Sequence, residues 1–426
     1  MSAPMNPGEP LMHARRLLTA IVAVVLVMLG SGGPAHARPS GDGDRPAWTL
    51  ITRTDTTKAG PARAAAPADD LKTECAKHSE AETDQGWPAG RYDQCFLKIK
   101  KAFILTDLET QQRLGEIDFS SSLLVHSYDN SRRVDYTFNF DEFSVDLRYG
   151  PEVYSDTTLT VAFGGCGALV TCSPALPQIT NTAAGWALAP SRNYDLTVTS
   201  NDDAGTGTYK IVRSLITMDF AVVSANPRIL GFNSTVAFSR SRFDTAGLAL
   251  GGVATGNKLS GAVMSDYIPT AVFDKSATSP YRAEAKHIDD ALHHTSLTFP
   301  SFSNKFVPGE GAFPLHRLMD SIAKDNNHDA SVRVCVAVWG PNYAQPRPPG
   351  RDCDEYPFQS TYEGSYTSTN GNPFQWNGSA RAIDSTQNQN GGTHLQQFYI
   401  NNRILDENVG SGQTGPTDPF RVAITG

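Results

Sequence analysis

The sequence lacks an excess of positive charge. Its 426 residues contain 36 Lys and Arg against 44 Asp and Glu, which gives a formal net charge of −8 at pH 7. This balance argues against a protein that binds nucleic acid through a broad basic field, because such a field needs many cations to neutralise phosphates. Any contact with a polyanion must therefore come from a few local side chains.

Long apolar runs are also scarce. One run covers residues 17–29, directly after Arg15 and Arg16 and shortly before the small-x-small sequence at 35–37. This order is typical of a secretory signal peptide, and the run is too short for a comfortable membrane span. We predict a signal peptide at residues 1–37. The mature protein is then expected to be secreted, extracellular and free of the membrane.

Cysteine is rare, and no Cys-x-x-Cys pair occurs among the six cysteines. The absence of that pair argues against a zinc site, which remains the alternative to disulfides. An exported protein with an even number of cysteines in local couples is expected to oxidise them. We predict disulfides in sequence order, although spacing alone does not prove the pairing: Cys75–Cys95, Cys166–Cys172 and Cys335–Cys353.

Composition divides the rest of the chain into three parts, and no repeat of fixed period is present. Residues 38–72 are rich in Ala, Pro, Arg, Asp and Gly, which predicts a disordered linker, with a short helix near 69–77 at its end. Residues 73–279 contain short alternating segments such as 133–140, which predicts an antiparallel β-sandwich or barrel of unknown role. Residues 280–426 form a mixed α+β region.

The α+β region has its own predicted elements. Residues 281–294 have the apolar period of a helix, and so does a segment that starts at Pro314. Alternating valines predict a strand at 331–339. We further predict a hairpin of 374–376 with 380–383, a polar turn at 387–392, a helix at 394–405 and a final strand at 419–425.

An acidic stretch at residues 351–364 stands out in this region. It interleaves carboxylates with bulky aromatic side chains, which fix the backbone and the rotamers around them. Fixed carboxylates suit a divalent cation or a proton transfer. The alternative is an ordinary turn with a disulfide at its edge. The four carboxylates belong to Asp352, Asp354, Glu355 and Glu363.

The predicted helix at 281–294 offers a second candidate site. His287, Asp290 and His294 lie at helical spacings that bring them to one face. This face is a possible metal site. Exposed His and Asp are common on short helices, however, so an ordinary solvated face is the alternative.

Five segments around the acidic stretch resemble the deoxyribonuclease NucA/NucB family of secreted bacterial endonucleases. They are 315–320 (LHRLMD), 353–358 (CDEYPF), 361–364 (TYEG), 395–399 (LQQFY) and 403–406 (RILD), with Asn388 before a glycine pair. The resemblance covers about the last third of the chain. It implies a ββα-metal, or His-Me finger, nuclease fold for residues 280–426 and DNA as the substrate.

The resemblance also implies roles for individual residues. In this family an aspartate of the motif replaces the usual histidine base, which points to Asp354. Glu363 becomes the first choice for the cation, with Asn388 as a second ligand or as an orienter of the loop. Glu355 would support the site through hydrogen bonds.

The chemistry of these side chains agrees with that assignment. Phosphodiester hydrolysis needs a positioned water and neutralisation of charge on the phosphate. Oxygen ligands such as Glu363 and Asn388 suit a hard cation, Mg²⁺ or Mn²⁺. Arg381 and Arg403 are candidates for bidentate contacts to the phosphate, with surface salt bridges as the alternative.

The resulting prediction is a secreted, metal-dependent endonuclease that hydrolyses DNA with little sequence preference. Its fold is α+β overall, with an all-β sandwich-like domain before a small α+β nuclease domain. Two alternatives remain open. One is an exported protein that binds the cell wall or a carbohydrate and has a degenerate nuclease domain. The other is a nuclease effector aimed at competing cells.

Overall fold

The computed structural model describes residues 68–426 apart from 176, 189–193, 251–258, 346–349 and 407–417. The predicted signal peptide at 1–37 and nearly all of the predicted linker lie outside the described residues. Helix α1 (Ala68–Cys75) agrees with the short helix predicted before the β-rich region. Within the described part of the chain, no helix combines the length and the apolar character that crossing a membrane requires.

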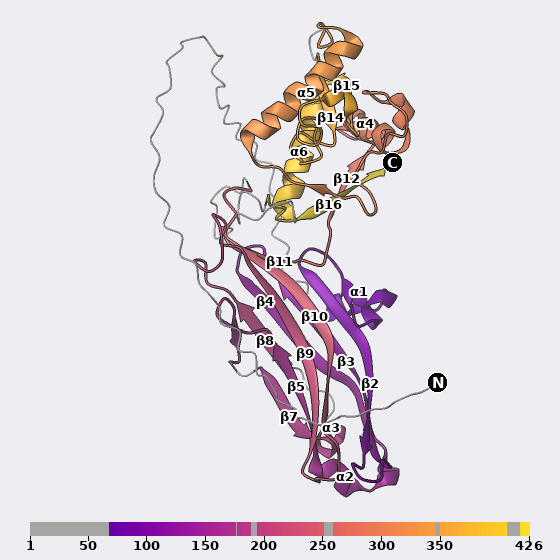
Figure 1. The fold of residues 1–426 in the computed structure, drawn as a ribbon, viewed down its shortest axis with the longest axis vertical. Coiled ribbons are helices and arrows are strands. Elements are labelled where there is room, and N and C mark those ends of the chain that lie inside the picture. Colours follow the sequence, from indigo (N-terminus) through magenta and orange to yellow (C-terminus); the bar gives the residue numbers. More distant parts are fainter. Residues whose placement is uncertain (1–67, 176, 189–193, 251–258, 346–349, 407–417) are drawn as a thin grey trace, which may run out of the picture. The chain divides into compact units, whose positions relative to one another are not determined.

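The β-rich region consists of two antiparallel sheets (Figure 1). One has the strand order β1 (Trp87–Pro88), β2 (Asp93–Thr106), β3 (Arg113–Ser127), β4 (Arg133–Val145), β8 (Tyr194–Thr199) and β6 (Thr171–Ser173). The other has the order β11 (Gly261–Met264), β10 (Phe232–Asp244), β9 (Val212–Ser224), β5 (Thr157–Gly164) and β7 (Gln178–Thr182). Two short helices, α2 (Pro151–Asp156) and α3 (Ala183–Leu188), accompany them.

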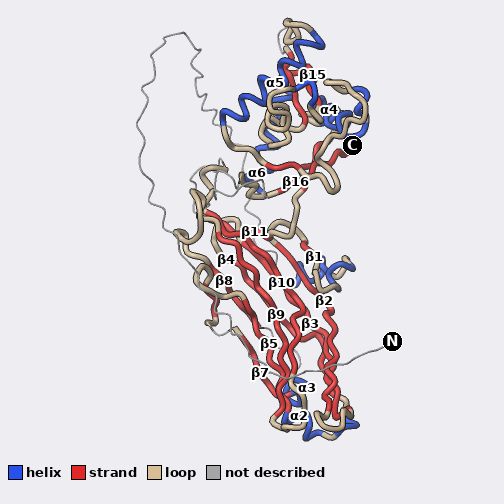
Figure 2. The backbone as a smooth tube through the Cα atoms, viewed as in Figure 1, coloured by secondary structure: helices blue, strands red, loops and turns tan. Residues whose placement is uncertain are grey.

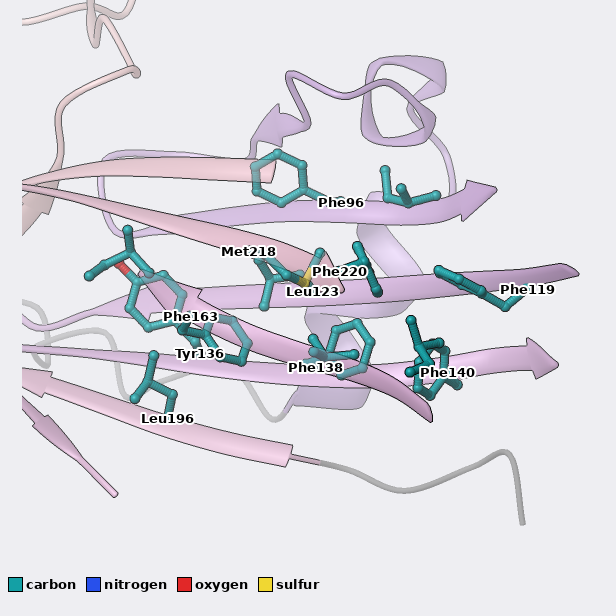
Figure 3. Close-up of a cluster of buried hydrophobic side chains, with 14 of the residues drawn as sticks. Phe96, Phe119, Leu123, Tyr136, Phe138, Phe140, Phe163, Leu196, Met218 and Phe220 are labelled. Carbon is teal, nitrogen blue, oxygen red and sulfur yellow. The ribbon is translucent and has the colours of Figure 1, made fainter. Parts of the chain in front are cut away.

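Alternation along the strands builds a shared core between these sheets. In β4, Val134, Tyr136, Phe138 and Phe140 are all fully buried, as their spacing of two predicts. They belong to one apolar cluster with Phe220 of β9 in the opposite sheet (Figure 3). The sandwich-like fold predicted for this region is therefore confirmed.

All three predicted disulfides are present. They join Cys75 to Cys95, Cys166 to Cys172 and Cys335 to Cys353.

The C-terminal elements mix helices with short strands (Figure 2). Strand β16 (Pro419–Thr425) pairs in parallel with β12 (Thr270–Asp274) and antiparallel with β13 (Leu315–His316). Strands β14 (Arg351–Tyr356) and β15 (Ser379–Asp384) form a separate antiparallel pair. Helices α4 (Arg282–His293), α5 (Ser321–Trp339) and α6 (Ser385–Asn401) all contact this pair. Strand β12 precedes residue 280, where we predict the boundary of the C-terminal domain, yet it pairs within this region.

Several local predictions are wrong in this region. The segment 331–339 is helical because its burial follows a helical period: Ala330, Ser331, Val334 and Cys335 are buried, whereas Val338 is 36% exposed. Strand β13 and the start of α5 at Ser321 replace the helix predicted from Pro314.

The predicted turn at 387–392 lies inside α6. The side chain of Asp384 caps this helix by accepting a hydrogen bond from the backbone N–H of Gln387. Residues 380–383 pair with β14 rather than with 374–376, and residues 373–375 form a 3₁₀ turn.

Candidate active site

The pairing of β14 with β15 decides which side chains meet. Asp354 lies opposite Arg381 and Tyr356 lies opposite Ser379. Residues that pair directly across an antiparallel ladder project on the same face, and neighbours along a strand project on opposite faces. These four side chains therefore share the face that packs against α4, whereas Glu355 points to the other face.

Asp354 is held by a buried histidine of α4. Its Oδ2 lies 2.7 Å from Nδ1 of His287, and Nε2 of His287 lies 2.7 Å from Oγ of Ser379. Burial lowers the pKa of His287 although the nearby Asp354 carboxylate opposes this shift. The neutral ring then donates from Nδ1 to the carboxylate and accepts the hydroxyl proton of Ser379 at Nε2. This chain of contacts fixes the orientation of Asp354, which retains 5% exposure.

Glu284 of α4 is a second buried carboxyl group beside Asp354. It is only 3% exposed, and its Oε2 has no hydrogen-bond partner among the described residues. Burial raises the pKa of Glu284 well above its usual value, and the carboxylates of Asp354 and Glu355 raise it further. Such an oxygen is costly to bury unless a proton or a cation accompanies it.

Helix α6 approaches Glu284 closely through a glycine. A Cβ atom added to Gly391 would lie 1.5 Å from Oε2 of Glu284, so any other residue there would force this carboxyl group to shift. Asn388 lies three residues before Gly391 in α6 and therefore faces the same side of the helix. Gln387 confirms that this side faces α4, because its Oε1 accepts a hydrogen bond of 2.7 Å from the backbone N–H of Ala283.

Glu355 lies on the opposite face of the strand pair, next to α5. Its Oε1 lies 3.7 Å from Nδ1 of His328, and it is 9% exposed. Burial raises the pKa of Glu355, while the interaction with Glu355 raises the pKa of His328. At 3.7 Å the contact is an ion pair rather than a hydrogen bond, so the hydrogen-bonding role that the resemblance implies for Glu355 stays a prediction.

The side chain of Glu363 is bound to His316 of β13 and not to Asp354. Its Oε1 lies 2.8 Å from Nδ1 of His316, and its Oε2 accepts a hydrogen bond of 3.0 Å from the backbone N–H of the same residue. Both oxygens are therefore used at β13. Each carboxylate oxygen accepts more than one contact and the side chain is 20% exposed, so the predicted role of Glu363 as a cation ligand stays a prediction.

The two candidate phosphate-binding arginines differ sharply. Arg381 lies at the site: its side chain is 25% exposed, and Nη1 lies 2.7 Å from Oδ2 of Asp290. Arg403 is 3% exposed and is bound to Asp244 of β10 and to the backbone oxygen of Asp129. The prediction of a phosphate contact at Arg403 is contradicted, because its donors are buried and already engaged.

The possible metal face on α4 has its side chains engaged in other contacts. His287 is fully engaged by Asp354 and Ser379, while Asp290 binds Arg381 and lies 3.4 Å from Nδ1 of His294. Across the described ranges of the chain, no group of three or more His, Cys, Asp or Glu side chains is arranged to hold a metal ion. A cation here would need one or two carboxylates together with amide oxygens and waters, which is how Mg²⁺ is usually bound.

Comparison with known proteins finds one family match in this region. Residues 320–408 match the family model described as deoxyribonuclease NucA/NucB. The match confirms the resemblance carried by the CDEYPF motif. It spans α5, β14, β15 and α6, so it includes Asp354 and Asn388 but neither Glu284 nor His287. No curated protein and no solved structure matches the chain.

Sequence reasoning missed one residue of this candidate site and gave another the wrong partner. The spacing of His287 marked a possible metal face, yet its partner is Asp354, which lies 67 positions further along the chain. Glu284 carries no motif of its own. Only the packing of α4 against β14 and α6 shows that its carboxyl group belongs to the site.

Proposed function

We propose that the protein is a secreted, metal-dependent endonuclease that hydrolyses phosphodiester bonds of DNA with little sequence preference. The observation that carries the proposal is the buried, oriented carboxylate of Asp354 inside a region that matches the NucA/NucB deoxyribonuclease model. A carboxylate of this kind is the residue that a hydrolytic nuclease needs as its general base.

Each side chain at the site takes a distinct task in this proposal. Asp354 accepts a proton from water, whose oxygen forms a bond to phosphorus as one P–O ester bond breaks and the leaving oxygen gains a proton. His287 holds Asp354 in position through Oδ2, which leaves the other carboxylate oxygen for the water. Arg381 lies on the same face and is partly exposed, as a phosphate contact requires.

A divalent cation, Mg²⁺ or Mn²⁺, would neutralise charge on the phosphate when bound. Glu363 and Asn388 are the residues that the resemblance names for this ion. Glu363 lies at β13, where His316 contacts both of its oxygens and each oxygen keeps a further lone pair. Asn388 lies, by helical spacing, on the face of α6 on which Gly391 approaches the buried and unpartnered Oε2 of Glu284.

The acidic composition sets the expected mode of binding. With a net charge of −8, the chain has no general attraction for DNA, so substrate contacts depend on local groups such as Arg381 and on the cation. Binding is therefore expected to be weak and to depend on the metal. This dependence also agrees with little sequence preference, because phosphate contacts carry no sequence information.

The direct test is a supercoiled plasmid incubated with the mature chain, purified without metal. We expect nicked and linear products when Mg²⁺ or Mn²⁺ is present, and none when EDTA is added. Intact plasmid under every cation tested would reject the nuclease function and favour a degenerate domain. Secretion is checked separately by finding the chain outside the producing cells, shortened by the residues of the predicted signal peptide.

A further inference from the structure

The unpartnered oxygen of Glu284 needs a chemical explanation. A buried carboxyl oxygen that lacks a hydrogen bond loses its hydration without compensation, and buried polar groups in proteins are almost always satisfied. Glu284 is more than nine-tenths buried, and its Oε2 is the orphaned atom. Its acidic neighbours Asp354 and Glu355 add repulsion rather than relief.

The surroundings of this oxygen are shaped to keep it in place. Gly391 is the point of closest approach of α6, and any side chain there would displace Oε2. The adjacent Gly392 has open space where a Cβ would be added. The close approach is thus a local feature of Gly391 and not a property of the whole helix. A second oxygen donor, the side chain of Asn388, lies on the same face of α6 by helical spacing.

We propose that Glu284, with Asn388 of the facing helix, supplies oxygen ligands to the divalent cation that works beside Asp354. The inference rests on the proposed nuclease function and extends it, because Glu284 lies outside the span that matches the NucA/NucB model. Glu284 is a ligand that the sequence resemblance does not name, because the resemblance assigns the carboxylate ligand to Glu363. Two protein oxygens completed by waters and a substrate phosphate suit Mg²⁺ or Mn²⁺.

The test compares the wild type with three variants in their affinity for Mn²⁺, without DNA. Binding is measured by electron paramagnetic resonance on the full mature chain. Glu284→Gln keeps the size of the side chain but removes its charge. Gly391→Ala keeps every carboxylate but forces Oε2 of Glu284 to move. The matched control is Gly392→Ala, which adds the same methyl group to the same helix where it meets no atom within 4 Å.

We expect Glu284→Gln and Gly391→Ala each to weaken Mn²⁺ binding at least ~10-fold, the size of loss known even for indirect partners of metal sites. Gly392→Ala should bind as the wild type does. Wild-type affinity in Glu284→Gln would overturn the proposal and leave Glu284 as a protonated acid, which glutamine mimics.

A second measurement covers the case in which these variants fail to fold. Crystals of the wild-type chain soaked in Mn²⁺ locate the ion by its anomalous scattering. A peak within coordination distance of Glu284 supports the proposal, and a peak elsewhere or no peak at all overturns it. Failure of the nuclease function is distinguishable: the wild type would then bind Mn²⁺ through Glu284 without cutting a plasmid.

Discussion

Replacing His287 by leucine should destabilise the protein strongly. The substitution keeps the volume of the side chain approximately, so a cavity contributes little. It removes the two hydrogen bonds of 2.7 Å that join His287 to Asp354 and Ser379, and all three residues are buried. Each orphaned partner costs about 1–3 kcal/mol, so the expected loss is about 2–6 kcal/mol.

The assay is urea denaturation followed by tryptophan fluorescence, to which the fully buried Trp376 contributes. The control is His293→Leu on the same helix, where the side chain is 45% exposed. A surface change of this kind is expected to alter stability by no more than about 0.5 kcal/mol. A loss below about 1 kcal/mol for His287→Leu would refute the reasoning, because neither Asp354 nor Ser379 would then depend on this ring.

Two further predictions concern stability in the same region. Burial lowers the pKa of Lys305 to about 8 from 10.5. Between these pH values the unfolded chain binds more protons than the folded one. The free energy of unfolding therefore rises with pH in this range. Lys305→Met should remove this rise in urea midpoints measured from pH 8 to 10, and an unchanged slope would contradict it. The disulfide between Cys335 and Cys353 spans 18 positions, so replacing both cysteines by alanine should cost about 3 kcal/mol in the same denaturation assay. An unchanged midpoint would show that the crosslink does not restrict the unfolded chain.

The β-rich region was predictable because its signal is local. Alternation in β4 places four apolar side chains on one face: Val134, Tyr136, Phe138 and Phe140. A strand in one of two packed sheets buries such a face, whichever strands pair with it. Residues 331–339 show where the same rule fails. Their valines alternate too, but Ser331, Val334 and Cys335 are the buried positions, so packing of a helical face against β14 and β15 overrides the β propensity.

The candidate site could be predicted only in part, because some of its side chains meet through tertiary contacts. Asp354 sits in a motif, so the sequence reveals it. Glu284 approaches it from helix α4, and no pattern in α4 records an electrostatic neighbour 70 positions further along the chain. Arg403 was predicted to bind phosphate, whereas in the structure its guanidinium binds the carboxylate of Asp244. Buried pairings of this kind depend on tertiary contacts that spacing alone does not encode.

The rate at which Asp354→Asn cuts plasmid DNA tests the central claim most directly. The substitution keeps the shape of the side chain and removes the base, and Asp325→Asn on the exposed face of α5 makes the same chemical change away from the site. With Mg²⁺ at saturation, the account predicts a rate for Asp354→Asn that is ~10²–10⁴-fold below that of the wild type, with Asp325→Asn unaffected. Cleavage by Asp354→Asn at the wild-type rate would contradict the account.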